Sequence, residues 1–189
     1  MGICGIDEAG RGPWAGPVVA AAVILPLKRR PRGLADSKQL TAEAREELAW
    51  AIRACAIVGV GQASPEEIDQ VNILQATYLA MRRALEALPQ RPAALLVDGN
   101  SAPDFGLPTE TIIDGDAHVA CISAASIIAK VERDRMMAEL CARHPGYSFA
   151  KHKGYGTPEH QEALVRLGPC AIHRLSFKPV RPVAAHYGL

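Results

Sequence analysis

The feature of the sequence that most constrains the fold is a series of short apolar segments separated by stretches of helical composition. Apolar runs of this length, bounded by glycine, proline or acidic residues, are typical of buried β-strands. Strands that alternate with helices along a chain indicate an α/β domain built around a central sheet. We expect strands at residues 1–7, 16–25, 57–63, 93–97 and 111–113.

The stretches between these segments carry signals for helix ends. Thr41 is a suitable N-cap residue, because its hydroxyl can accept a hydrogen bond from a backbone N–H group of the first turn. The tetrapeptide Ser64-Pro65-Glu66-Glu67 combines an N-cap serine, proline at the first helical position and a glutamate three residues after the serine. We expect helices over residues 41–56, 64–88 with a break near Asn72, 118–143 and 158–167.

The helix expected over residues 118–143 has two distinct faces. One apolar stripe at helical spacing should be buried. Its members are Ile122, Ala125, Ala129, Met136 and Leu140. A second face carries Ser123, Ser126, Lys130 and Arg133. On this face we expect Arg133 to be solvated.

Length and composition fit one soluble domain. The chain has 189 residues, of which 49% are hydrophobic and 22% charged, enough for one substantial core. We expect a single domain over residues 1–189, with a core of about 1–145 and a C-terminal segment of about 146–189 that has an irregular, basic tail from residue 168. Apolar stretches fall short of the roughly 20 residues of a membrane helix.

Cysteine usage and the N-terminus bear on the compartment. The five cysteines are widely spaced and form no C-x-x-C pair, which disfavours a zinc site or a redox dithiol. Buried free thiols in a reducing environment are the simplest interpretation. The N-terminus lacks the pattern of a secretory signal. We therefore expect a cytoplasmic protein.

Charge is distributed unevenly along the chain. Residues 118–189 hold 10 basic and 5 acidic side chains and all six histidines, whereas residues 1–117 hold 11 basic and 15 acidic side chains. A positive C-terminal third can face a polyanion such as nucleic acid. An uneven surface without function is an equally acceptable explanation of the charge alone.

Acidic residues close three of the expected strands, in Ile6-Asp7-Glu8, Val97-Asp98 and Ile113-Asp114-Gly115-Asp116. One such acid is common in turns, but three strand ends that meet at one edge of a sheet indicate a site. Adjacent residues on a strand point to opposite faces. Asp7 and Glu8 can therefore serve one site only if the chain bends there.

Grouped carboxylates favour a divalent cation, because close negative charges resist joint ionisation. Hard oxygen ligands suit Mg2+ or Mn2+ rather than zinc. Beside basic residues, such a cluster indicates metal-dependent cleavage of a phosphodiester, with two metal ions activating water and stabilising the leaving oxygen.

Several segments, in order along nearly the whole chain, resemble the ribonuclease HII family. They are GIDEAGRGPWAGPVVAAAVIL, DSKQLT, EEIDQVNILQAT, LLVDGN, GDAHVACISAASIIAKVERDR, HKGYGTPEH and HRLSFKPV. The resemblance implies a ribonuclease H-like fold, with a central mixed β-sheet flanked by helices and a helical C-terminal segment. It implies an endonuclease that cuts the RNA strand of RNA–DNA hybrids and cuts 5′ of single ribonucleotides in duplex DNA. Products would carry a 3′-hydroxyl and a 5′-phosphate, and the cofactor would be Mn2+ or Mg2+.

The resemblance also assigns the catalytic, metal-binding carboxylates. They are Asp7, Glu8, Asp98 and Asp116. The family places the last acid between glycine and alanine, which selects Asp116 rather than Asp114. We expect Asp114 to face solvent. Trp14 stands where the family usually has a smaller residue, and we interpret it as a packing or rim residue.

Substrate-binding residues follow from the same match. Gly10 and Gly12 would let the backbone approach the ribonucleotide sugar, and Arg11 would help to hold a phosphate; a plain tight turn is the alternative. Tyr155 would pack on the deoxyribose next to the ribonucleotide, unless it is simply an exposed loop residue. The other candidates would contact the phosphate backbone or steady the acids: Lys38, Ser126, Lys130, Lys151 and Lys153. The histidines are neither spaced as a metal site nor needed as general bases.

We expect the partner to be nucleic acid, with no membrane, and a monomeric state. Two alternatives remain at this point. A junction resolvase of the same fold would share the carboxylates without needing the Gly10-Arg11-Gly12 turn and Tyr155. A hybrid-binding protein with an inactive site is disfavoured because unneutralised carboxylates would repel nucleic acid.

Overall fold

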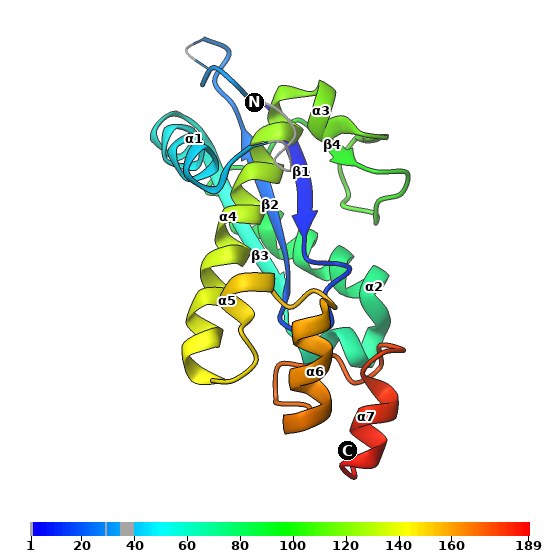
Figure 1. The fold of residues 1–189 in the computed structure, drawn as a ribbon. Coiled ribbons are helices and arrows are strands. Elements are labelled where there is room, and N and C mark those ends of the chain that lie inside the picture. Colours follow the sequence, from blue (N-terminus) through cyan, green and yellow to red (C-terminus); the bar gives the residue numbers. More distant parts are fainter. Residues whose placement is uncertain (1, 29, 35–39) are drawn as a thin grey trace.

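A computed structural model describes residues 2–28, 30–34 and 40–189 of the chain. Its centre is a five-stranded sheet with the strand order β3-β2-β1-β4-β5 (Figure 1). The β1–β2 and β2–β3 pairs are antiparallel, whereas β1–β4 and β4–β5 are parallel. The expected mixed sheet is therefore confirmed. The strands are β1 (Ile3–Ala9), β2 (Val18–Ile24), β3 (Ile57–Ala63), β4 (Ala94–Asp98) and β5 (Thr109–Ile112).

Helices cover both faces of the sheet. Helix α2 packs on one face, and α1 and α4 pack on the other. Because β2 lies inside this sandwich, all seven of its residues are buried, which explains why it is apolar throughout rather than alternating. The described helices are α1 (Ala42–Cys55), α2 (Pro65–Glu86), α3 (Gly115–His118), α4 (Ala120–Arg143), α5 (Phe149–His152), α6 (Pro158–Leu167) and α7 (Arg181–His186).

A close contact joins the start of α4 to the first strand. A Cβ atom on Gly5 would lie 2.2 Å from the carbonyl carbon of Cys121. Only glycine lets the backbone of α4 approach β1 so closely. Since Asp7 lies two residues further along β1, on the same face of the strand, the contact brings α4 beside that carboxylate.

The two helix starts for which the sequence carries N-cap signals, at Thr41 and Ser64, are confirmed. The Thr41 hydroxyl accepts a hydrogen bond from the N–H of Ala44 at 3.2 Å. Ser64 and Glu67 form a reciprocal capping box at the start of α2. The break in α2 lies at Asn72, which has φ 70°, and the side-chain oxygen of Asn72 accepts from the N–H groups that follow, so it restarts the helix.

Four expectations about elements and burial are wrong. The helix expected from residue 118 is two helices, α3 and α4, and the residue that it buries fully near its end is Met137, while Met136 is only half-buried. Helix α7 lies in the tail that we expected to be irregular. Cys55 is exposed rather than buried, although all five thiols are free.

The C-terminal segment has a small core of its own at the end of α4. Its buried members are Ala15, Met137, Tyr147, Phe149, Ala163 and Ile172. The stretch between β1 and β2 runs along this segment: the N–H of Trp14 donates to the carbonyl of Gly154, and the N–H of Gly16 donates to the carbonyl of Ile172, both at 2.8 Å. These contacts fix residues 153–156 beside the end of β1.

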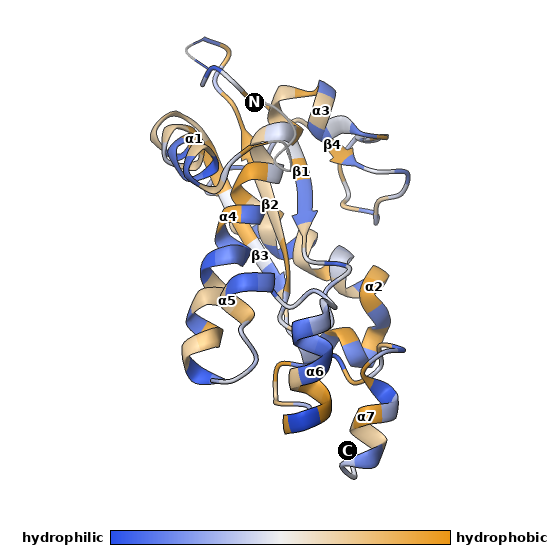
Figure 2. Ribbon diagram, viewed as in Figure 1, coloured by the Kyte–Doolittle hydropathy of each residue, from blue (hydrophilic) through white to orange (hydrophobic). Residues whose placement is uncertain are grey.

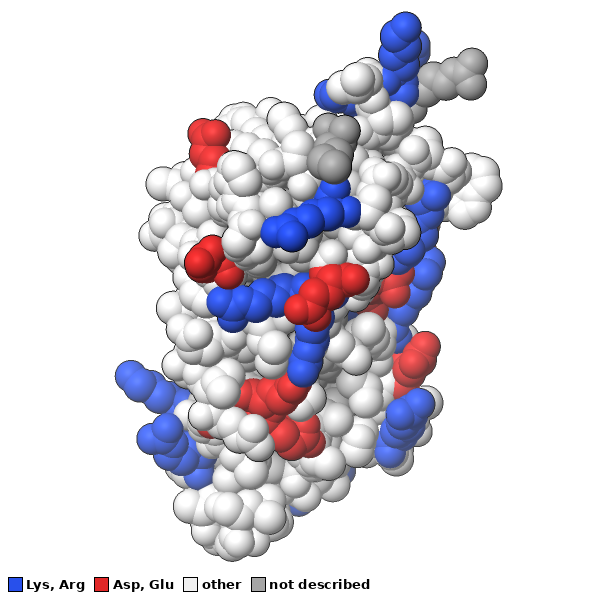
Figure 3. Space-filling model, turned by 180° about the vertical axis from the view of Figure 1, so that it is seen from behind, with Lys and Arg blue, Asp and Glu red and all other residues white. Residues whose placement is uncertain are grey.

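The distribution of apolar and charged residues fits a folded domain with a net charge of only +1. Hydrophobic colour concentrates on the inner strands, whereas the end of β1 is hydrophilic (Figure 2). On the face seen from behind, basic and acidic side chains are interspersed (Figure 3). Within the described residues, no helix is both long and apolar enough to cross a membrane.

Candidate active site

Asp7 and Asp98 lie where the parallel strands β1 and β4 end together. The last Cα pair in their register is Ile6 with Val97, and each of these residues is followed by an aspartate. Asp7 and Asp98 are therefore neighbours at the carboxyl edge of the sheet, the position at which α/β sheets form sites. The sequence prediction that strand ends gather the acids is confirmed for this pair.

The expectation that the chain bends at Asp7 and Glu8 is wrong. Strand β1 continues to Ala9, because Glu8 and Ala9 still pair with Ala20 and Val19 of β2. The chain turns only at Gly10, which has φ 96°. Glu8 nevertheless lines the same cavity as Asp7, since β4 has ended and no longer flanks β1 on that side.

The fourth acid, Asp116, lies in α3, the short helix that follows β5. Asp114 is exposed and has the left-handed φ of 53° that begins the turn, whereas Asp116 is buried. The N–H of Asp116 donates to Oδ1 of Asp98 at 3.2 Å, and its carbonyl accepts from the Ser123 hydroxyl of α4. The expectation that Asp114 faces solvent is confirmed.

All four acids line one cavity of about 250 Å³. Its other lining residues come from the glycine-rich turn, from α4 and from the loop after α5. They are Ala9, Gly10, Arg11, Gly12, Ser126, Lys130, Arg133 and Tyr155. A larger hollow of about 380 Å³ lies apart from these residues, beside the end of α2, and it has no comparable group of acids.

Negative charge accumulates in the cavity. Burial, with the nearby charges of Glu8 and Asp98, raises the pKa of the Asp7 carboxyl well above its usual value, and a hydrogen bond from Ser126 opposes the shift. Burial likewise raises the pKa of Glu8, against the pull of the Arg11 guanidinium 3.3 Å away. Charged carboxylates in this place need a cation near them.

The donor set fits a hard divalent cation, because every acid offers oxygen and none of the described residues that line the cavity offers sulfur or imidazole. In the described part of the chain, as the side chains stand, no three His, Cys, Asp or Glu residues are grouped tightly enough to hold an ion. The acids therefore share a cavity without forming a closed cage.

The substrate candidates Gly12 and Tyr155 meet at the rim of the cavity. A Cβ atom on Gly12 would lie 3.7 Å from Cε1 of Tyr155, so the ring packs beside the turn. The Tyr155 side chain is about half exposed, at 47%. Trp14 packs against the same loop: its ring lies where a Cβ of Gly156 would be, and it stacks at a tilt on His160 with centroids 5.4 Å apart.

The basic candidates for substrate binding differ in burial and in whether their charge is paired with an acid. Lys130 pairs with Asp134 at 2.6 Å, and burial lowers the pKa of its ammonium group. Lys151 pairs with Glu159 at 2.6 Å. Lys153 is half-buried and has a φ of 53°. Lys38 lies outside the described residues.

The expectation that Arg133 is solvated is wrong, since its exposed fraction is 1%. A signal for this burial was present in the sequence, because Arg133 lies four residues from Ala129 on the buried stripe and four from Met137. Sequence reasoning also missed Arg174, which is fully buried. No local pattern distinguishes Arg174, because its partners lie at the other end of the chain.

Carboxylates at the ends of parallel strands, beside a glycine-rich turn and a basic C-terminal segment, define this protein as a nuclease with the ribonuclease H-like fold. The family model described as ribonuclease HII matches residues 4–180. The chain therefore belongs to the ribonuclease HII family, and it is an enzyme that hydrolyses the RNA of RNA–DNA hybrids.

Individual relatives agree with this assignment. The chain is 60% identical over 180 residues to a ribonuclease HII from Parvibaculum lavamentivorans, covering 95% of this chain and 67% of that protein. The structure resembles the ribonuclease H2 of Pyrococcus horikoshii OT3, with a TM-score of 0.81 at 28% identity, over 100% and 99% of the two chains. It also resembles RNase HII from Archaeoglobus fulgidus, solved in complex with PCNA, with a TM-score of 0.75 at 28% identity, over 94% and 96% of the chains.

Proposed function

We propose that this enzyme removes ribonucleotides from DNA by cutting 5′ of single ribonucleotides embedded in a duplex, in addition to cutting hybrids. Products would carry a 3′-hydroxyl and a 5′-phosphate. One observation carries the proposal: the four acids, the Gly10–Gly12 turn and Tyr155 line a single cavity. A phosphate, the ribose beside it and the next sugar can thus be contacted together.

In this proposal Asp7, Glu8, Asp98 and Asp116 hold two Mn2+ or Mg2+ ions. When bound, such ions supply a water of lowered pKa and positive charge at the leaving oxygen. The donor set supports the assignment, and so does the raised pKa of the Asp7 carboxyl, because a bound cation would stabilise the charged form that burial and the neighbouring acids disfavour. Small side-chain rotations would close the acids around the ions, and Ser126 would orient Asp7 through its hydrogen bond.

Recognition of the ribonucleotide would come from the turn and the tyrosine. Backbone groups of Gly10 to Gly12 can approach a 2′-hydroxyl, which is both donor and acceptor and distinguishes RNA from DNA. The ring of Tyr155, next to Gly12, would pack on the following sugar, where an additional hydroxyl is disfavoured. This arrangement would select an RNA-to-DNA junction.

Basic side chains would supply attraction without sequence preference. Arg11 is half exposed at the cavity and can reach a phosphate after leaving Glu8. Lys130 and Lys153 would add to the attraction, as would Lys38. Each phosphate neutralised makes binding more sensitive to salt, so the affinity for duplex should fall as ionic strength rises.

The direct test uses end-labelled duplexes with Mn2+, Mg2+ or EDTA. The substrates are DNA with one ribonucleotide, an all-DNA duplex and a branched junction. Cleavage only at the ribonucleotide, and only with metal, supports the proposal. Equal cleavage of the all-DNA duplex would refute it, and cleavage confined to the branched junction would favour a resolvase instead.

A matched pair of variants tests the tyrosine. Tyr155 and Tyr187 are equally exposed, at 47% and 46%, but only Tyr155 lines the cavity. Tyr155→Ala should reduce cleavage of the embedded ribonucleotide more than cleavage of a long hybrid, whereas Tyr187→Ala should leave the ratio of the two activities unchanged. An equal effect of both variants on this ratio would remove Tyr155 from the proposal.

The proposal also includes one catalytic domain over residues 1–189 that acts as a monomer in the cytoplasm. Five free thiols, of which Cys55 is exposed, suit a reducing compartment. Light scattering on a size-exclusion column measures the oligomeric state directly, and a dimer mass would contradict this part.

A further inference from the structure

Two arginines are buried beneath the active site. The exposed fractions of Arg133 and Arg174 are 1% and 0%. Buried guanidinium groups normally pair with carboxylates. Among the described residues, neither arginine forms a salt bridge, and all of their hydrogen bonds go to backbone carbonyl groups.

Arg174 holds the turn that carries the glycines. Its Nη2 donates to the carbonyl of Gly10 at 2.6 Å, its Nη1 donates to that of Arg11 at 2.9 Å, and its Nε donates to that of Gly16 at 3.0 Å. Three separate carbonyls are thus fixed by one planar group, which suits the fork of donors that only arginine has.

These bonds orient the N–H groups of the same peptide planes. In a trans peptide the C=O of one residue and the N–H of the next point in opposite directions. With the carbonyls of Gly10 and Arg11 held toward Arg174, the N–H groups of Arg11 and Gly12 point away from it. Both residues line the cavity and Arg174 does not. Within the described chain, no hydrogen bond occupies these two N–H groups.

Arg133 joins the same turn to the loop that carries Tyr155. It donates to the carbonyls of Ala15 and Pro17, at 3.1 and 3.0 Å, and to that of Lys153 at 2.9 Å. Its side chain also packs directly under Gly10, where a Cβ atom would lie 2.0 Å from Nε. The two loops at the rim of the cavity therefore share one buried support.

A carboxylate on α2 anchors the segment from which Arg174 projects. Asp69 accepts hydrogen bonds from the N–H of Leu175 at 2.8 Å and from the N–H of Ser176 at 2.9 Å. The residues immediately after Arg174 are thereby fixed to the core. This anchor lets a side chain near the C-terminus set the geometry of a turn near the N-terminus.

We propose that Arg174 and Arg133 are positioning residues that preorganise two N–H donors, those of Arg11 and Gly12, for the 2′-oxygen of the target ribonucleotide. The inference deepens the proposed function and rests on it. Burying two cations costs free energy. Here the hydrogen bonds of both guanidinium groups fix the backbone of the loops at the cavity. Preorganised donors discriminate well, because a ligand that lacks the matching atom leaves them unpaired.

The test measures binding without cleavage. Fluorescence anisotropy in EDTA gives the Kd of a duplex with one embedded ribonucleotide and of the same duplex in all-DNA form. For the wild type we expect tighter binding of the ribonucleotide duplex. Arg174→Lys, whose single ammonium nitrogen cannot replace donors on three separate nitrogen atoms, should reduce the ratio of the two Kd values at least fivefold, toward one. Partial unfolding would weaken the binding of both duplexes equally, so it cannot produce a fall in this ratio.

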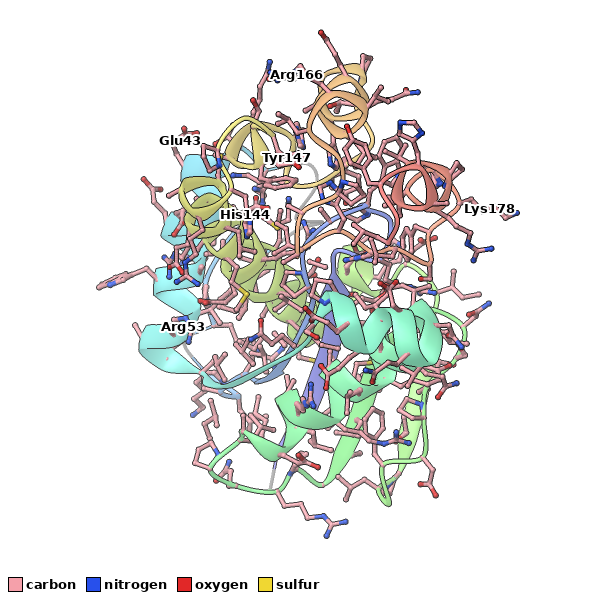
Figure 4. All side chains as sticks on the ribbon, turned by 90° about the horizontal axis from the view of Figure 1, so that it is seen from below. Glu43, Arg53, His144, Tyr147, Arg166 and Lys178 are labelled. Carbon is pink, nitrogen blue, oxygen red and sulfur yellow. The ribbon has the colours of Figure 1, made fainter. Side chains whose placement is uncertain are left out.

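Arg166→Lys is the matched control. Arg166 is exposed on α6 and points away from the body of the protein (Figure 4), so the ratio should stay at the wild-type value. Arg174→Ala should regain discrimination when millimolar guanidinium is added, but not with ethylammonium, which has the charge without the planar fork. Should Arg174→Lys fail to fold, Asp69→Asn tests the same positioning role. It weakens the contact that fixes the residues after Arg174, and it should also lower the ratio.

The outcomes separate this inference from the proposed function. An unchanged ratio in Arg174→Lys and Asp69→Asn, with the wild type discriminating, overturns the positioning role and leaves the proposed function intact. Failure of the wild type to cut embedded ribonucleotides, while it still cuts a hybrid, overturns the proposed function. A wild type that cuts them but binds both duplexes equally overturns the role of the N–H donors in binding.

Discussion

Acid should destabilise this protein through His173 before most carboxylates are protonated. His173 is buried, and its ring is used in the neutral form: Nδ1 accepts from the N–H of Cys170 at 2.9 Å, and Nε2 lies 3.1 Å from Nε2 of His160. The other ring nitrogen of His160 donates to the carbonyl of Tyr155 at 2.9 Å. A proton added to Nδ1 of His173 would face the N–H that it now accepts.

Burial, with the neighbouring His160, lowers the pKa of His173 from 6.5 to about 4. The unfolded chain therefore binds this proton first as the pH falls, and stability declines between pH 6.5 and about 4. At about 1.4 kcal/mol per unit of pKa, the full loss is roughly 3 kcal/mol. By pH 5 it is roughly 2 kcal/mol, a large part of the stability of an ordinary domain.

Urea unfolding at pH 7.5 and pH 5.0 measures this difference in the free energy of unfolding. The wild type should lose roughly 2 kcal/mol more than His173→Gln, which cannot titrate, between the two pH values. The exposed His186 of α7 is the matched control, and His186→Gln should keep the wild-type loss. The pKa of Glu67 is lowered to about 2, so that carboxylate responds only below this window. Equal losses in the wild type and His173→Gln would refute the reasoning.

Three further substitutions have defined outcomes. Asp98→Asn should lower kcat by roughly 100-fold or more on every substrate. It should not lower the melting temperature, because it removes negative charge beside Asp7. Full activity would contradict the assignment of the acids. Gly10→Ala should lower both stability and kcat/KM, with strain of about 1 to 3 kcal/mol from its φ of 96° and a clash with Arg133; unchanged unfolding in urea would contradict the close contact. Ser64→Ala should cost about 1 kcal/mol of stability through the lost cap on α2 and leave kcat/KM unchanged, which the same two assays check.

Sequence reasoning succeeded where the signal is local. Thr41, the Ser64–Glu67 capping box and the break at Asn72 each involve groups only a few residues apart, so the chain specifies them without its tertiary partners. The gathering of acids was predictable for a related reason. Parallel strands end at a common edge, and an acid that closes a strand is carried there by the strand itself.

Sequence reasoning failed where a residue's environment comes from distant segments. The strand through Glu8 continues because β2 supplies partners on one side, while the end of β4 opens the other side to the cavity. Solvation was the natural expectation for the charged Arg133. Its burial depends on the carbonyl of Pro17, 116 positions away in the chain.

The sequence by itself determined the α/β class, the helix starts that carry N-cap signals and the placing of acids at strand ends, because periodicity, caps and strand-terminal residues are written in neighbouring positions. The selection of Asp116 rather than Asp114 rested on the resemblance to the ribonuclease HII family. Only the tertiary structure decided that two guanidinium groups lie beneath the Gly10–Gly12 turn and that His173 must be neutral. Burial and hydrogen bonding set these properties, and both arise when the C-terminal segment packs against residues from the opposite end of the chain.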